Sequence, residues 1–157
     1  MTDVINFTLE RLDLIEPAKS VVLELMKLCP EIMFTSGRRN RQQQAISMAE
    51  NVMENRNWIG QTYVQSAASL LCQKWVNEHP VATREEIAAG LEEELEELTD
   101  DDVAHLSKHL KGLAFDVKPV SGIEGKKIRE AIQTVVARHG GKFLEREGGL
   151  IRWHVQF

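Results

Sequence analysis

Residues 107–117 read SKHLKGLAFDV, and the fold that we expect for the chain is built around them. Its second half, Leu113–Val117, is a short and mostly apolar run, bounded by Gly112 on one side and soon followed by a proline on the other. Such a run predicts a buried β-strand. His109 therefore lies just before this strand, and Asp116 lies on it.

The last segment of the chain, residues 142–157, predicts a β-hairpin with Gly148-Gly149 as its two-residue turn. His154 lies on the second strand of this hairpin. Trp153, its neighbour, alternates with it and is expected to point away from it, into the core or against a helix at 124–139.

Helical patterns fill most of the chain before these strands. Two capping boxes predict helix starts, one from Thr83 with Glu86 and one from Ser121 with Glu124. The expected helices are 17–28, two long ones between Arg41 and about Pro80 with a break near 55–57, one after Thr83, and 124–139. Residues 32–34 are expected to form a first strand. The second of the two long helices is expected to point five side chains toward a core: Ile59, Tyr63, Leu70, Leu71 and Trp75. Helices first and strands mostly late predict an α+β fold, a small antiparallel sheet packed with several helices, in one domain over residues 1–157.

Composition narrows the functional classes. The chain is 43% hydrophobic and 27% charged, which is typical of soluble globular proteins. Its net charge is -5 and it has no basic stripe, which argues against nucleic acid as a partner. No apolar stretch approaches the ~20 residues of a membrane span, and the N-terminus lacks the pattern of a signal peptide. We expect synthesis in the cytoplasm, and buried thiols rather than a disulfide at Cys29 and Cys72.

Eight of the eleven residues in 92–102 are acidic. The simplest interpretation is the solvated face of a helix. A metal site within Glu92–Glu97 and a protein-interaction module built on this acidic helix are the alternatives.

The pattern SxHLxGxAxDV at 107–117, followed by Trp153-His154-Val155, resembles the zinc peptidases of the D-Ala-D-Ala carboxypeptidase and L-alanyl-D-glutamate endopeptidase family, which includes several phage endolysins. Residues 35–39, TSGRR, are similar to the S-G-x-R segment of that family. The three blocks follow the family's order, whereas residues from about 57 to 100 match none of its motifs.

The resemblance implies a zinc ion held by His109, Asp116 and His154, with a fourth position open for water. Zinc would polarise the scissile carbonyl of a peptidoglycan stem peptide and acidify the bound water. Arg39 would hold a carboxylate or carbonyl of the peptide by a forked pair of hydrogen bonds, and Ser36 would assist there.

Arg38 and His105 are close in sequence to these residues. Arg38 stands where the family usually has an aromatic residue. His105 precedes His109 by four positions, which on a helix mimics a metal pair, but the context of Asp116 favours His109.

The family usually has an acidic residue three positions before its last histidine, and here that residue is Ile151. A two-residue hairpin turn would set Glu147 opposite Leu150, Glu145 opposite Arg152 and Phe143 opposite His154. Directly opposite side chains share a face, so both glutamates would lie on the face of His154 and Glu147 would replace the missing catalytic base. The alternative is that both are exposed charges, with Glu145 paired to Arg152.

Two functions follow from these residues. One is a zinc peptidase that acts on the cell wall after its release from the cytoplasm. The other is a catalytically silent, zinc-binding relative with a structural or cell-wall-binding role, which Ile151 favours.

Overall fold

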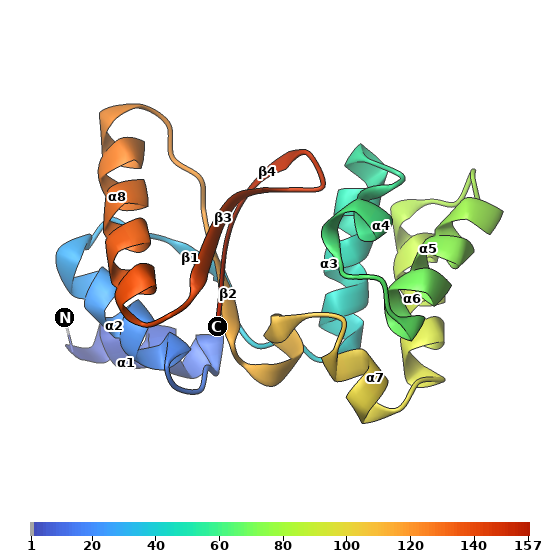
Figure 1. Cartoon of the computed structure of the whole chain (residues 1–157), viewed down its shortest axis with the longest axis horizontal. Helices are drawn as coiled ribbons and strands as arrows, with labels where there is room; N and C mark the ends of the chain where they lie inside the picture. Colours follow the sequence, from blue (N-terminus) through green and yellow to red (C-terminus); the bar gives the residue numbers. More distant parts are fainter. Residues whose placement is uncertain (1) are drawn as a thin grey trace. The chain divides into compact units, whose positions relative to one another are not determined.

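A computed structural model describes residues 2–157. These residues form eight α-helices, one short 3-10 helix and a four-stranded antiparallel sheet, which confirms the predicted α+β class (Figure 1). Their contacts gather into two compact units. Unit 1 contains residues up to Arg38 with 111–146 and 151–157, and unit 2 contains 39–110 with 147–150. The single domain over 1–157 stays a prediction, because two units of one chain can still unfold together.

The sheet of unit 1 has the strand order β1-β2-β4-β3. Its strands are β1 (Phe34–Ser36), β2 (Ala114–Val117), β3 (Lys142–Glu147) and β4 (Leu150–Gln156). Both the buried strand after Gly112 and the terminal hairpin are where the sequence predicts them. The helices of this unit are α1 (Thr2–Leu12), α2 (Ala18–Leu28) and α8 (Gly122–Arg138), of which α1 has no counterpart among the predicted helices.

The register of β2 and β4 gives the sheet two different faces. On one face Phe115 pairs with Val155 and Val117 with Trp153, and all four side chains are buried in the apolar core of unit 1. On the other face Asp116 pairs with His154 and Ala114 with Gln156. Trp153 packs edge-on against Phe143 and lies under the guanidinium of Arg129 from α8. The predicted direction of Trp153, toward the core and α8, is therefore confirmed.

A bulge in β1 turns Ser36 onto the second face. Phe34 pairs with Val117 and Ser36 pairs with Asp116, so two steps along β1 correspond to one step along β2. The extra residue is Thr35, and such an insertion re-aims the side chain that follows it. Phe34 consequently enters the core, where its ring packs edge-on against Phe115, and Ser36 lies on the face of Asp116.

Unit 2 contains α3 (Arg41–Glu54), α4 (Trp58–Thr62), α5 (Ala67–Glu78), α6 (Arg84–Glu96), α7 (Asp100–Ala104) and the first part of the 3-10 helix η1 (Lys108–Lys111). The second long helix expected before Pro80 is wrong, because the chain breaks again between α4 and α5. Ser66 starts α5 as its N-cap and accepts a hydrogen bond from the Ser69 amide. This restart changes the helical phase, so Leu70 and Leu71 are exposed and Ala68, Cys72 and Val76 are buried instead.

One of the two predicted capping boxes forms. The Thr83 hydroxyl accepts from the Glu86 amide, and the Glu86 carboxylate accepts from the Thr83 amide. Ser121 precedes α8 but makes no side-chain cap hydrogen bond, so the second box is wrong. The first helical residue there, Gly122, has φ of +74°, whereas the residue after an N-cap normally has helical dihedral angles.

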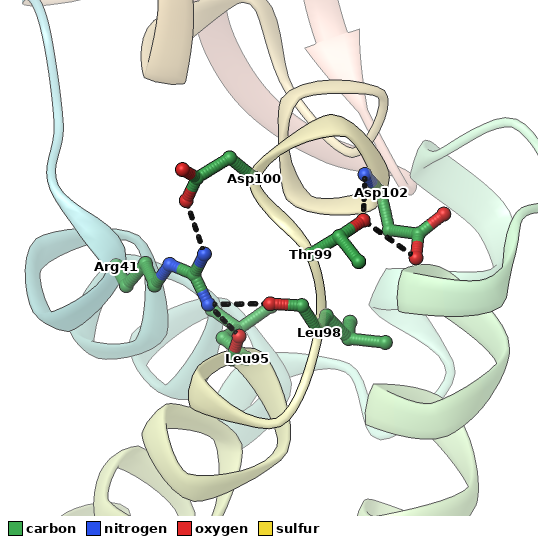
Figure 2. Close-up of polar contacts among 6 residues, drawn as sticks. All are labelled: Arg41, Leu95, Leu98, Thr99, Asp100 and Asp102. Atoms are coloured by element: carbon green, nitrogen blue, oxygen red, sulfur yellow. Dashed lines mark hydrogen bonds and ion pairs between the residues drawn. The ribbon is translucent and has the colours of Figure 1, made fainter.

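Arg41 closes the C-terminal end of α6. Its guanidinium donates to the carbonyls of Leu95 and Leu98 and pairs with Asp100 (Figure 2). Carbonyls at a helix C-terminus lack partners within the helix, and a cation there also opposes the negative end of the helix dipole. Figure 2 also shows the start of α7, where the Thr99 hydroxyl accepts a hydrogen bond from the Asp102 amide.

Both cysteines are free and buried, as predicted, Cys29 in the core of unit 1 and Cys72 in that of unit 2. None of the helices formed by residues 2–157 has the length and apolar character needed to cross a membrane.

Candidate metal centre

The first residue of the centre, His109, is held by a short turn. The Ser107 hydroxyl accepts a hydrogen bond from the His109 amide at 3.3 Å, and the Ser107 carbonyl accepts one from the Leu110 amide at 3.2 Å. This serine therefore caps η1 in the way that serine caps helix starts. The His109 side chain is buried, with the residue only 2% exposed. The serine of the SxH pattern thus has a structural task, which is to fix the backbone of the histidine.

Gly112 links this turn to β2. Its φ is +72°, which glycine adopts without strain. A β-carbon at this position would lie 2.7 Å from the guanidinium of Arg38. The chain passes directly from His109 through Gly112 onto the strand that carries Asp116.

Asp116 and His154 are direct neighbours on adjacent strands. Their backbones are in register, and the Nδ1 of His154 lies 2.9 Å from the Oδ1 of Asp116. Side chains directly opposite in an antiparallel pair share a face, so the ladder itself sets this contact. The His154 side chain is 6% exposed and that of Asp116 is 20% exposed.

His109, Asp116 and His154 form a group in which one ligand atom from each residue lies within 4.8 Å of the others. Two imidazoles and a carboxylate are common ligands of divalent transition metals. Atoms this close, on side chains that are buried or half-buried, are within reach of one cation after small side-chain rotations. The group can therefore hold a metal ion.

His105 is not part of this group. Its side chain is 62% exposed, and its Nδ1 contacts the Asp101 carbonyl one turn back on α7 at 2.6 Å. The i, i+4 spacing of His105 and His109 does not produce a metal pair here because α7 ends at Ala104, before His109 is reached.

The TSGRR segment contains two residues with structural tasks. A β-carbon on Gly37 would lie 2.2 Å from the Leu12 carbonyl oxygen, so only glycine fits there. Arg38 donates from Nε to the Asp13 carbonyl at 3.0 Å and forms an ion pair with the Asp13 carboxylate. In unit 1 the segment thus packs against the end of α1, and Arg38 is the residue that fastens it.

Arg39 is tied to the first histidine through the backbone. Its amide donates to the His109 carbonyl at 3.0 Å, and its guanidinium donates to the side-chain oxygen of Gln44 at 3.3 Å. Gln44 is fully buried, and its amide nitrogen donates to the Tyr63 hydroxyl at 2.8 Å. A buried amide needs such partners. The role of Arg39 in substrate binding stays a prediction, as does that of Ser36, which lies in register with Asp116.

The ion pair expected between Glu145 and Arg152 does not form. Glu145 pairs with Arg129 of α8 at 3.5 Å rather than with Arg152, and Phe143 packs on Trp153. Both contacts lie on the core side of the hairpin, because Trp153 is buried there. Phe143 and Glu145 therefore contact core-side residues, Trp153 and Arg129.

Glu147 follows Phe143 and Glu145 at the same alternation along β3. It is the last residue of β3 and is half-buried, and its carbonyl accepts from the Trp58 indole nitrogen at 3.1 Å. Its role as a catalytic base stays a prediction.

Ile151 is 52% exposed. It lies three residues before His154 on β4, and an odd separation on a strand places two side chains on opposite faces. In this strand, a side chain at position 151 therefore leaves the sheet on the side of Trp153.

Two functional candidates were missed by the sequence-based interpretation. Gln156 contacts His154, with its side-chain oxygen 3.0 Å from Nε2. Its position two residues after His154 on one strand was a signal for this contact, because such residues share a face. Gln44 lies within a run of three glutamines, and nothing in that run distinguishes the buried one.

Comparison of the chain with protein-family models, curated proteins and solved structures found no match in any of the three.

Proposed function

We propose that this protein is a zinc-dependent peptidase that hydrolyses peptidoglycan stem peptides, as an endolysin or a carboxypeptidase. The observation that carries the proposal is the group of His109, Asp116 and His154, with ligand atoms within 4.8 Å of one another. The resemblance of residues 107–117 and of Trp153-His154-Val155 to the zinc peptidases supports the peptide substrate.

Zinc is the metal we propose because of the donor set. Catalytic zinc sites have three protein ligands from histidine and carboxylate side chains and keep one position open. When bound, zinc would supply a Lewis acid for the scissile carbonyl and lower the pKa of its water ligand.

The residues of the chain would bind and orient the peptide. Arg39 is fixed at its backbone by His109 and at its guanidinium by Gln44, and a fixed guanidinium is suited to a forked contact with a substrate carboxylate. Ser36, on the face of Asp116, would donate a further hydrogen bond to the peptide. Glu147 is the proposed proton acceptor, supported by its half-buried position at the end of β3.

The metal is tested first by elemental analysis. Wild-type protein should contain about one zinc per chain, as a three-ligand site predicts. His109→Ala, Asp116→Ala and His154→Ala should each lose most of it, because each removes one of three ligands. His105→Ala is the matched control, since this histidine is exposed and outside the group. Full zinc content in all three ligand variants would refute the site.

Hydrolysis is tested on purified muropeptides, with mass spectrometry of the products. Zinc-loaded wild type should release new peptide fragments, and His154→Ala should release none. Fragments that appear equally with His154→Ala would point to a contaminant or to another site.

The second candidate function is a silent zinc-binding protein of the cell wall. One observation favours it, the presence of Ile151 at the family's acidic position. It predicts full zinc content and sedimentation with insoluble peptidoglycan, without any fragment in the muropeptide assay.

A further inference from the structure

The imidazole of His154 is held at both nitrogens. Nδ1 lies 2.9 Å from the Asp116 carboxylate oxygen, and Nε2 lies 3.0 Å from the side-chain oxygen of Gln156. The ring is also buried, with 6% of the side chain exposed. Two polar contacts on opposite edges of a buried ring leave it little rotational freedom.

The two contacts distinguish the nitrogens chemically. Nδ1 points at Asp116, which belongs to the same ligand group, so a cation shared by the two residues would be held through Nδ1. A neutral imidazole has one protonated and one unprotonated nitrogen. If Nδ1 binds the metal, then Nε2 carries the proton and donates a hydrogen bond to the Gln156 oxygen.

The strand explains why Gln156 reaches this position. It lies two residues after His154 on β4, so both side chains leave the sheet on one face. Its partner across the ladder is Ala114, whose small side chain is fully buried. The amide oxygen also accepts a hydrogen bond without adding a second negative charge beside Asp116.

We infer that Gln156 is a positioning residue of the metal centre, whose amide oxygen holds His154 in the Nε2-protonated form so that Nδ1 binds the metal. This inference rests on the proposed zinc site. An acceptor behind a ligating histidine fixes its tautomer and ring orientation, and such partners commonly account for a factor of about 10 to 100 in metal affinity.

Three variants test it. Gln156→Met keeps the length of the side chain but removes the acceptor, whereas Gln156→Glu retains an acceptor oxygen. Gln133→Met makes the same chemical change at an exposed position of α8. Zinc affinity is measured by competition with a chromophoric chelator. We expect Gln156→Met to bind zinc about 10 to 100 times more weakly than wild type, and Gln156→Glu and Gln133→Met to bind within about threefold.

A second readout reports the tautomer directly. Long-range ¹H–¹⁵N spectra of the zinc-loaded wild type should show His154 with a protonated Nε2 and a metal-bound Nδ1. Gln156→Met should lose this single state and shift the His154 signals, which a merely space-filling role of Gln156 would not cause. Circular dichroism of the zinc-free proteins checks that all variants fold.

The outcomes separate this inference from the proposed function. Zinc bound through Nε2, or unchanged affinity in a folded Gln156→Met variant, overturns the role of Gln156 and leaves the peptidase proposal standing. A wild type that binds no zinc overturns both. The expected affinities and tautomer without any muropeptide hydrolysis support Gln156 and overturn only the peptidase.

Discussion

Ile151 and His154 lie on opposite faces of β4. The resemblance implies an acid three residues before the last histidine, but three residues along β4 lead to the other face of the sheet. The three candidate metal ligands are placed by shorter-range constraints. Asp116 and His154 face each other by register, and His109 is joined to Asp116 by a short segment that includes Gly112.

Glu147→Gln tests the proposed catalytic base. If it accepts the proton, Glu147→Gln should keep its zinc and lower the turnover of muropeptides by about two to four orders of magnitude, because that is the usual contribution of a general base. The measurement is initial rate at saturating zinc, with zinc content determined on the same samples.

Glu145→Gln is the matched control for this experiment. Its carboxylate is exposed and paired with Arg129, and exposed pairs contribute little, so its turnover should stay near that of wild type. Equal turnover in Glu147→Gln and wild type would remove Glu147 from the mechanism.

Two arginines of unit 2 perform the same task at the scale of helices. Arg41 donates to the Leu95 carbonyl in the last turn of α6 and to the Leu98 carbonyl just after it. Arg56 donates to the Val76 and His79 carbonyls at the end of α5. Neither α5 nor α6 has a basic residue in its own last turn. A residue distant in the sequence therefore supplies the cation that these helix ends lack.

Arg41→Ala tests how much the contacts at the end of α6 stabilise the protein. It removes the charged donor from the carbonyls of Leu95 and Leu98, and hydrogen bonds from charged groups contribute about 1.5–3 kcal/mol. We expect the free energy of unfolding to fall by about 1–3 kcal/mol in urea titrations. Asp100→Asn should change it far less, because the Asp100 carboxylate is fully exposed and exposed ion pairs contribute little.

Arg84→Ala is a further control, since its partner is the exposed Glu85 on the same helix. A loss as large in Arg84→Ala as in Arg41→Ala would show that the effect comes from removing any arginine. It would contradict a specific role for the contacts at the end of α6.

The predictable and unpredictable elements differ in what determines them. The strand at Leu113–Val117, the hairpin around Gly148-Gly149 and the box at Thr83 follow from local patterns, and all three are present. The bulge at Thr35 and the packing of Phe143 on Trp153 depend on contacts between distant segments. Periodicity alone does not encode those contacts, which is why Ser36 and Glu145 required the structure.

At the scale of the whole molecule, the chain passes between the two units four times, after Arg38, Leu110, Arg146 and Leu150. Neither unit is a continuous piece of sequence. Unit 1 is complete only when the C-terminal strand β4 has joined β2, and by then all of unit 2 has been traversed. Such interleaving favours one cooperative unfolding transition, as small single domains usually show.

The two cysteines allow this to be measured, because each lies in the core of one unit. Cys29 is 1% exposed in unit 1 and Cys72 is fully buried in unit 2. Burial raises the pKa of Cys29 and raises the pKa of Cys72 to about 12, and the thiolate is the reactive form. Both thiols should therefore be inert to a thiol reagent at pH 8 in the native protein.

With increasing urea, Cys29→Ala and Cys72→Ala variants each report the opening of one core through the remaining thiol. If the chain unfolds as one domain, each variant should gain thiol reactivity at the urea midpoint that circular dichroism gives for the same variant. Adding a zinc chelator should lower that midpoint for both thiols together, because a metal bound only by the native state stabilises whatever unfolds with it. A chelator effect confined to Cys29, or reactivity of Cys72 well below the dichroism midpoint, would show that the units open separately.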